Sequence, residues 1–247
     1  MKSPPSFFVN GPLAVGEAVR LSDEERRHAR ARRLRAGSAV RLIDAAGRVG
    51  SGTVSRLDGE ILEIRVEDVR EPEPANTSIT VLAPVLRSTR LSWLIEKATE
   101  LGAARVLLVD SSRAQGDRAE RAAGERARFV RLAREAAKQC GRSTFPSVEG
   151  PVPFSEAIAC PSDRRLLLDA SGAEFPASVR ERKVAIWVGP EGGFTPDEIS
   201  AAGSAGWERV RLPGATLRAE TAALAGLALS ALAIDRAGAR ADNSSTR

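Results

Sequence analysis

The chain has 247 residues, of which 43% are hydrophobic and 28% are charged, so it is long enough for one large globular domain or two smaller ones. Its two cysteines and single histidine argue against a disulfide framework, a structural zinc site or a histidine-based hydrolase, and we expect no metal. No apolar run is long enough to cross a bilayer and the first residues lack the apolar stretch of a signal peptide, so we expect a cytoplasmic protein with no membrane partner.

The net charge is +5, from 37 basic and 32 acidic residues. Four of the basic residues are lysines and all the others are arginines. The planar guanidinium of arginine suits phosphates and base edges, but it is the location of the charge along the chain that carries information.

The first region, from Phe7 to about Val69, has short alternating apolar patterns interrupted by one helical stretch. The helix is expected to begin after Ser22, because Ser22 and Glu25 fit a capping box. These patterns predict a small β-barrel that carries one basic helix. The expected strands cover residues 40–43, 52–55 and 61–66.

Residues 20–35 hold seven arginines against three acidic residues. At helical spacing, Arg26, Arg30 and Arg33 would share one face. A solvated surface is the usual explanation for a run of charge, but the gathering of one sign on a small barrel favours a face that contacts RNA. His28 is interpreted as a structural or RNA-facing residue rather than a metal ligand.

A proline-containing linker at residues 70–77 leads into a region where strands and helices alternate. Apolar spacing predicts helices over residues 91–101 and 129–140, ended by Gly102 and Gly141. This alternation indicates a largely parallel sheet, in which ligands bind beyond the carboxyl ends of the strands. The expected strands cover residues 79–85, 105–109, 165–168, 184–188 and 209–212.

The first unusual loop, Val188-Gly-Pro-Glu-Gly-Gly-Phe, follows the strand at 184–188. Its glycines would let the backbone approach a ligand, while Glu191 would disfavour a pyrophosphate and suit a neutral or cationic ligand. Thr195 is expected to cap the next helix, with Pro196 at its first position and Glu198 closing a capping box. A tight turn into a capped helix, without a ligand, is the alternative.

The second loop segment, residues 210–222, leads from a strand into a helix that is expected to begin near Thr216 or Leu217. Arg218 would then lie at the positive end of that helix, where a cation is disfavoured, which makes it a candidate for function. An ion pair with Glu220 or Glu191 would be the purely structural explanation. The helix over 219–233 is apolar nearly all round and is expected to be buried or in a subunit interface, and the tail 239–247 is expected to be disordered.

The glycine loop followed by Leu217-Arg-Ala-Glu-Thr-Ala resembles the family of small-subunit (16S) ribosomal RNA uridine N3-methyltransferases, of the trefoil-knotted SPOUT class. Ile95-Glu-Lys-Ala-Thr-Glu-Leu-Gly, Glu135-Ala-Ala-Lys-Gln-Cys-Gly-Arg and the stretch from His28 to Gly37 are similar to further signatures of that family. The resemblance implies an α/β protein: a PUA-like β-barrel that binds RNA at residues 1–72, and a SPOUT-type knotted domain at residues 77–247. The second domain would bind S-adenosyl-L-methionine and form a homodimer.

The activity implied is transfer of a methyl group from S-adenosyl-L-methionine to N3 of a specific uridine in small-subunit ribosomal RNA. Arg218 would stabilise negative charge on the uracil, and Glu220 would accept a proton or orient Arg218. The methyl-donor pocket is expected to comprise Gly189, Pro190, Glu191, Gly192, Gly193, Leu212, Pro213, Gly214 and Leu217. The expected RNA contacts are Arg26, Arg30, Arg33, Arg35, Arg87 and Arg142.

Two departures from the family's pattern stand out: Ala219 replaces a common threonine, and Arg87-Ser-Thr-Arg replaces a segment that usually contains lysine. Two other functions stay open. One is ribose 2′-O methylation of RNA, which related knotted enzymes perform. The other is a non-catalytic RNA-binding factor in ribosome assembly, against which the intact glycine loop and Arg218 argue.

Overall fold

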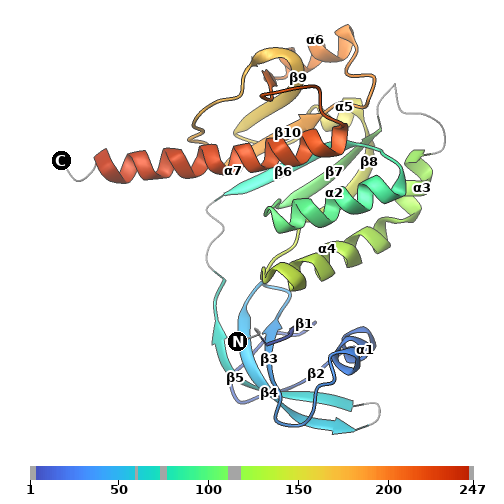
Figure 1. The fold of residues 1–247 in the computed structure, drawn as a ribbon, viewed down its shortest axis with the longest axis vertical. Helices are drawn as coiled ribbons and strands as arrows, with labels where there is room; N and C mark the ends of the chain where they lie inside the picture. Colours follow the sequence, from blue (N-terminus) through green and yellow to red (C-terminus); the bar gives the residue numbers. More distant parts are fainter. Residues whose placement is uncertain (1–3, 59–60, 73–76, 111–117, 245–247) are drawn as a thin grey trace. The chain divides into compact units, whose positions relative to one another are not determined.

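The computed structural model describes residues 4–58, 61–72, 77–110 and 118–244, drawn as a ribbon in Figure 1. The chain forms two compact units. The first comprises residues 1–75 together with 137–144, and the second comprises residues 76–136 and 145–247. Residues 137–144 thus belong to the first unit, whereas we expected all of 77–247 to form one domain.

The first unit is built on a five-stranded sheet in the order β1-β3-β4-β5-β2. Strand β1 runs parallel to β3, and the other neighbours are antiparallel. The three predicted strands are present, with longer bounds for β4 and β5, while β1 and β2 were not predicted. The strands are β1 (Ser6–Phe8), β2 (Ala18–Arg20), β3 (Ala39–Ile43), β4 (Val49–Asp58) and β5 (Ile61–Arg70).

The single helix of this region, α1 (Asp23–Ala31), begins where the sequence predicts. The Ser22 hydroxyl accepts a hydrogen bond from the Glu25 amide at 3.4 Å, which is the first half of the expected capping box. The carboxylate of Glu25 turns into the interior instead, where it accepts from the Phe8 amide at 3.4 Å and pairs with Lys138 Nζ at 2.7 Å. Both charged side chains are buried, with exposed fractions of 1% for Glu25 and 3% for Lys138.

A second buried carboxylate, Asp44, organises the turn between β3 and β4. It accepts hydrogen bonds from the amides of Ala46 and Arg48 at 2.9 and 3.0 Å and from the Leu13 amide at 3.2 Å. Burial alone would raise the pKa of Asp44, but these amides and the Arg48 guanidinium lower it overall.

The second unit contains a six-stranded, all-parallel sheet in the order β11-β9-β10-β6-β7-β8, which confirms the predicted β/α alternation. All five predicted strands are present, and β8 was not predicted. The strands are β6 (Ser78–Pro84), β7 (Arg105–Asp110), β8 (Ser147–Pro153), β9 (Arg164–Glu174), β10 (Lys183–Val188) and β11 (Glu208–Arg211).

Helices cover both faces of this sheet. Alternate residues of its strands are therefore buried on opposite sides. Residues of α2, α7 and the first part of α4 pack on one face, around Val81 and Ile186. Residues of α5 and α6 pack on the other, around Trp187. Figure 1 shows α2 and α7 together on one side of the sheet. The helices are α2 (Ser88–Glu100), α3 (Arg118–Gly124), α4 (Arg126–Cys140), α5 (Phe154–Ala157), α6 (Pro196–Ser204) and α7 (Ala219–Ser244).

Helix ends follow the sequence at some points and not at others. Gly102 and Gly141 follow α2 and α4 with φ of 86° and 77°, values that glycine adopts without strain, as predicted. Helix α7 continues to Ser244, so the expectation of a disordered tail is wrong for residues 239–244, and residues 245–247 lie outside the described part.

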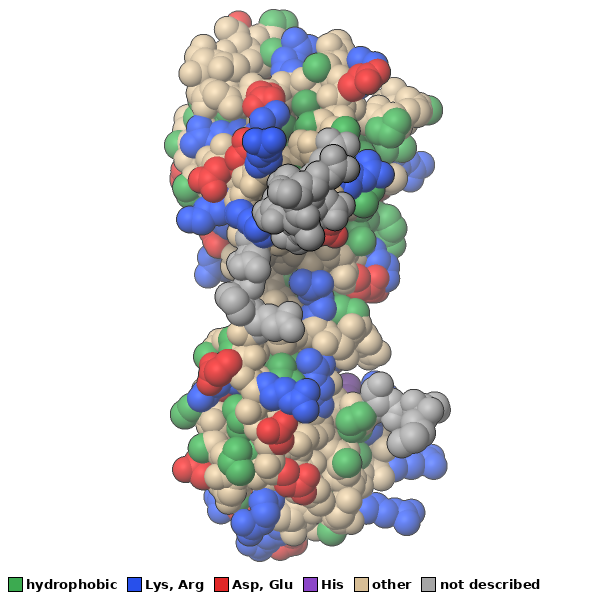
Figure 2. Space-filling view, turned by 90° about the vertical axis from the view of Figure 1, so that its left-hand side faces the viewer, with side chains coloured by type: hydrophobic (Ala, Val, Ile, Leu, Met, Phe, Trp, Pro, Cys, Tyr) green, Lys and Arg blue, Asp and Glu red, His purple; other side chains and the backbone are tan. Residues whose placement is uncertain are grey.

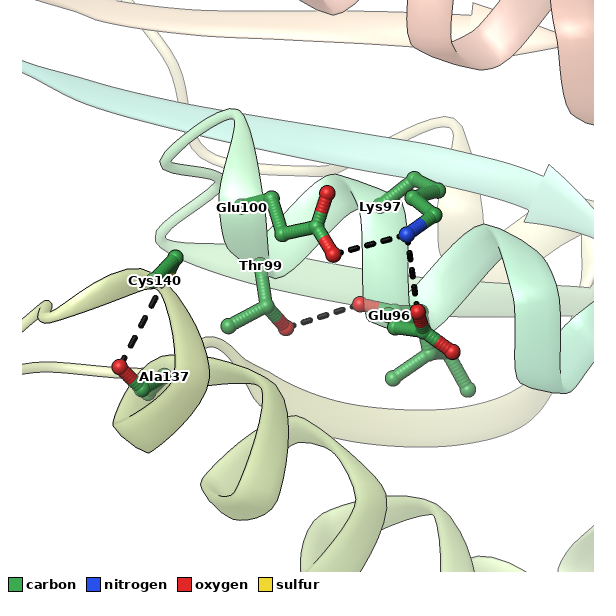
Figure 3. A network of polar contacts seen from close by, with 7 residues as sticks. Glu96, Lys97, Thr99, Glu100, Ala137 and Cys140 are labelled. Atoms are coloured by element: carbon green, nitrogen blue, oxygen red, sulfur yellow. Dashed lines mark hydrogen bonds and ion pairs between the residues drawn. The ribbon is translucent and has the colours of Figure 1, made fainter. Parts of the chain in front are cut away.

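Helix α2 carries most of one of the segments similar to the family's signatures, residues 95–102, and the side chains of Lys97 and Thr99 in it find their partners within the helix (Figure 3). Lys97 Nζ contacts carboxylate oxygens of Glu96 and Glu100 at 2.8 and 2.7 Å, and these hydrogen bonds raise the pKa of Lys97. The buried Thr99 hydroxyl donates to the Ile95 carbonyl at 2.7 Å. This segment therefore stabilises α2, and we assign it no ligand.

Candidate active site

A cavity of about 1040 Å³ lies in the second unit beyond the carboxyl ends of β9, β10 and β11. This is the edge of a parallel sheet where ligands bind. Both loops singled out in the sequence meet there. Of the residues predicted for the methyl-donor pocket, all but Gly192 line the cavity, and Arg218 lines it as well. Glu220 directly follows Ala219, which lines the cavity, but does not line the cavity itself.

The loop after β10 is held between a buried strand and a capped helix. A Cβ atom on Gly189 would lie 3.0 Å from the Phe194 ring, so a larger residue would displace that ring. Phe194 itself packs edge-on against Trp187 of β10 at a centroid distance of 5.6 Å. The predicted capping box is confirmed: Glu198 N donates to Thr195 Oγ1 at 3.1 Å, and Thr195 N donates to Glu198 Oε2 at 2.7 Å. The loop is thus firmly anchored at both ends.

Arg218 precedes the first residue of α7, and its carbonyl accepts a hydrogen bond from the Ala222 amide at 2.8 Å. The helix therefore begins at Ala219, later than the predicted start near Thr216 or Leu217. Arg218 is exposed on the cavity wall at the positive end of the helix. Among the described residues, no hydrogen bond or ion pair joins its guanidinium to Glu220 or Glu191, so the purely structural explanation for Arg218 is wrong.

The partner of both carboxylates is Arg90, in the first turn of α2. Its Nε donates to Glu220 Oε1 at 2.9 Å and its Nη2 binds Glu220 Oε2, while its Nη1 binds Glu191 Oε1. Sequence reasoning missed this residue and placed its segment among the RNA contacts. The sequence does contain a signal for Arg90. It is a cation in the first turn of a helix that has no acidic residue in that turn, and a cation is disfavoured there unless it has a partner elsewhere.

These ion pairs decide the charge state of Glu220. Burial would raise the pKa of its carboxyl group, but the hydrogen bonds from Arg90 and the charges of Arg90 and Arg218 lower it overall. The pKa of Arg90 is raised, chiefly by its hydrogen bonds to Glu220. A carboxylate held by a two-pronged, charge-assisted contact is a poor proton acceptor.

The other acidic residues of the cavity lining are also paired. Asp169 Oδ1 lies 2.9 Å from Arg209 Nη2, and Glu174 Oε1 lies 2.8 Å from Arg211 Nη2. Together with the Glu191 contact to Arg90, every carboxylate that lines the described cavity has an arginine partner. Glu191 shares its arginine partner with Glu220, so one guanidinium serves two carboxylates.

The residues predicted to contact RNA are divided between the two units, because Arg87 belongs to the second unit and the others to the first. Helix α1 ends at Ala31, and Arg33 has a left-handed φ of 53°, so the prediction that Arg33 shares a helical face with Arg26 and Arg30 is wrong. Arg26 is only partly exposed and binds the Asp23 carboxylate. On the side drawn in Figure 2, Lys and Arg side chains are interspersed with Asp and Glu within each unit.

His28 has a structural contact, as interpreted from the sequence: its ring meets the edge of Phe7 at a centroid distance of 5.6 Å. It also lines a second cavity, of about 540 Å³, within the first unit. Arg32 and Arg41 line the same cavity, and Arg41 Nη1 donates to the Gly141 carbonyl at 2.7 Å. Sequence patterns could not single out Arg41, because its partner lies 100 residues away along the chain.

Comparison with known proteins identifies the family. A family model described as an RNA methyltransferase domain matches residues 73–231, more than half of the chain. The chain belongs to this RNA methyltransferase family. A second model, described as an RNA methyltransferase PUA domain, matches residues 21–67. The predicted fold class, an α/β protein with a parallel sheet and a PUA-like N-terminal domain, is thereby confirmed.

Relatives cover nearly the whole of this methyltransferase chain. Ribosomal RNA small subunit methyltransferase E of Mycobacterium bovis is 31% identical over 233 residues, which cover 90% of this chain and 88% of the relative. The crystal structure of that enzyme from Neisseria gonorrhoeae, bound to S-adenosyl methionine, is 28% identical with a TM-score of 0.82, covering 92% of this chain and 96% of that one. A probable rRNA-methyltransferase from Porphyromonas gingivalis is 28% identical with a TM-score of 0.78, covering 90% and 95%. Within the described part of this methyltransferase, no helix has the length and apolar character needed to span a bilayer.

Proposed function

We propose that this chain transfers a methyl group from S-adenosyl-L-methionine to N3 of a specific uridine in small-subunit (16S) ribosomal RNA. The observation that carries the proposal is the exposed Arg218 on the wall of the cavity formed by the two loops. The carboxylates that line the described cavity are each paired with an arginine, whereas Arg218 forms no hydrogen bond or ion pair with a carboxylate among the described residues. Its guanidinium is therefore available to a substrate in the cavity.

The cavity suits the methyl donor in size and lining. Its volume of about 1040 Å³ leaves room for a nucleoside-sized cofactor and a base beside it. Apolar walls from Leu212 and Leu217 and the open backbone at Gly214 would hold the adenosyl group, with Gly189 and the other predicted pocket residues of the two loops around it. When bound, S-adenosyl-L-methionine supplies an electrophilic methyl group.

Arg218 is the proposed catalytic residue. Uridine N3 carries a proton in the neutral base, and its nucleophilicity rises as that proton leaves. The Arg218 guanidinium would stabilise the negative charge that develops on the uracil imide. Proton acceptance, one of the two roles predicted for Glu220, is disfavoured, because its contact with Arg90 lowers the pKa of its carboxyl group and makes it a weak base.

The first unit would hold the RNA. N3 lies on the Watson–Crick edge, so the target uridine must be unpaired or extruded before it enters the cavity. Arg30, Arg33 and Arg35 are exposed and are proposed to contact phosphates, which position a large substrate without reading its sequence. The proposed RNA contacts also include Arg26, Arg87 and Arg142.

We also propose a homodimer formed by the second unit. Leu217 and Leu232, which line the cavity, have exposed fractions of 37% and 44%. A second copy of the chain over this side would bury them and enclose the cavity. The resemblance described above further supports a trefoil knot in this unit, a functional division at residues 1–72 and 77–247, and a cytoplasmic location.

The test is to incubate the protein with S-adenosyl-L-methionine and unmodified small ribosomal subunits, or naked RNA, and to analyse the digested nucleosides by mass spectrometry. N3-methyluridine is the expected product. A methyl group on the ribose would contradict the proposed reaction at N3 and indicate 2′-O transfer instead. No methyl group, with no binding of the donor in calorimetry, would favour a non-catalytic assembly factor.

Arg218→Ala is the informative variant in the same assay. It is expected to lose transfer by about 100-fold or more, by analogy with loss of one charge-stabilising donor, while the donor still binds. Loss of donor binding by this variant would make Arg218 a pocket residue instead.

A further inference from the structure

Arg90 lies where the first turns of α2 and α7 meet the glycine loop, and it links all three. Its guanidinium uses Nε and Nη2 for Glu220, in the first turn of α7, and Nη1 for Glu191, in the glycine loop. The side chain of Glu220 is 9% exposed and that of Arg90 is 26% exposed, so the pair is largely screened from solvent. Such a pair holds its geometry better than an exposed one.

The charges around Arg218 make this contact consequential. Glu220 follows Arg218 by two residues at the start of α7, and the charge of Arg218 contributes to the lowered pKa of Glu220. Without Arg90, the Glu220 carboxylate would be free to pair with Arg218. An Arg218 paired with Glu220 would present little net charge to a substrate.

We infer that Arg90 is a positioning residue for methyl transfer: by binding both carboxylates, it joins the glycine loop to the start of α7 and leaves Arg218 available to the substrate. This inference rests on the proposed function of Arg218. It assigns Arg90 a role in arranging the site, and it places no contact between Arg90 and either substrate.

Arginine suits this position because a single side chain contacts two carboxylates. A guanidinium offers five N–H donors in a rigid plane, and three of its nitrogen atoms are used here. A lysine has a single nitrogen at the end of a flexible chain, so it could neutralise charge without fixing both partners. Arg90→Lys is therefore expected to be intermediate between the wild type and Arg90→Met.

The test compares Arg90→Met with the double variant Arg90→Met/Glu220→Gln. The single variant is expected to lower kcat about 10- to 100-fold at saturating donor and RNA, because misplacement of a reacting group has effects of this size. In the double variant no carboxylate remains at position 220 to capture Arg218, so kcat is expected to recover severalfold. Arg131→Met, an exposed position on α4, is the control for loss of an arginine and should keep wild-type kcat.

A second readout needs no RNA. Reaction of Arg218 with phenylglyoxal, followed by peptide mass spectrometry, reports how available its guanidinium is. Labelling is expected to slow severalfold in Arg90→Met and to recover in the double variant, while thermal unfolding by circular dichroism confirms that each variant is folded.

The outcomes separate this inference from the proposed function. If the wild type transfers no methyl group, the proposed function fails, and labelling still decides whether Arg90 keeps Arg218 available. A double variant no better than Arg90→Met in both kcat and labelling would overturn the inference. Recovery of labelling without recovery of kcat would show that Glu220 acts directly in the reaction, which would also overturn it.

Discussion

Breaking the buried ion pair between Glu25 and Lys138 should strongly destabilise the first unit. The two side chains are almost completely buried, and Lys138 Nζ also lies 5.8 Å from the centre of the Phe8 ring. Removing one partner of a buried pair leaves the other charge without compensation, which costs about 3–5 kcal/mol. We therefore expect Lys138→Met to lower the free energy of unfolding of this unit by about 3–5 kcal/mol.

The double variant Glu25→Leu/Lys138→Met tests the origin of this loss. It removes both charges but also the carboxylate that accepts from the Phe8 amide, so a residual loss of about 1–3 kcal/mol is expected. The double variant should thus be more stable than Lys138→Met alone. Arg131→Met, an exposed change on the same helix, should stay within about 0.5 kcal/mol of the wild type.

Urea unfolding followed by far-ultraviolet circular dichroism is the suitable measurement. All three tryptophans of the chain lie in the second unit, so their fluorescence follows that unit and not the first. A loss below about 1 kcal/mol for Lys138→Met, or a double variant less stable than Lys138→Met, would refute the reasoning.

Three other perturbations follow from the structure. Asp44→Asn should lower the free energy of unfolding of the first unit at neutral pH. Because the pKa of Asp44 is lowered in the folded state, the loss of stability relative to the wild type should shrink as the pH falls below about 4. Thermal unfolding at acid pH that shows the same loss would contradict this. Gly189→Ala should weaken binding of S-adenosyl-L-methionine in calorimetry, since its Cβ would displace the Phe194 ring; wild-type affinity would contradict the proposed role of this loop. Arg30→Glu combined with Arg33→Glu should weaken RNA binding and reduce its salt dependence in filter binding; unchanged affinity and salt slope would remove these two arginines from the proposed RNA surface.

The parts of the fold that could be predicted are those with a long, regular apolar pattern. The helix over 91–101 and the strand over 184–188 have such patterns, and the structure contains both. Strands β1 and β2 have three residues each, which is too short for alternation to be visible. Strand β8 was missed because its sequence, Ser-Val-Glu-Gly-Pro-Val-Pro, has the glycine and prolines of a turn.

The candidate site was predictable to the extent that topology brings strand ends together. The two loops follow β10 and β11, which both pair with β9, so the carboxyl ends of these strands meet at one edge. Arg90 could not be assigned its partners, because they lie 101 and 130 residues away along the chain. The error at Arg33 has a local cause: a left-handed residue that is not glycine ends the helical path without a sequence signal.

The division of the chain into two units has a consequence for anyone who wishes to separate them. The first unit is discontinuous, since residues 137–144 complete it after the chain has passed through β6, α2, β7 and α3. A fragment ending at residue 75 would lack Lys138 and would leave the Glu25 carboxylate buried without its cation. The RNA-binding unit proposed for this protein therefore cannot be produced by a single truncation. A protein that is to contain this unit must also include residues 137–144.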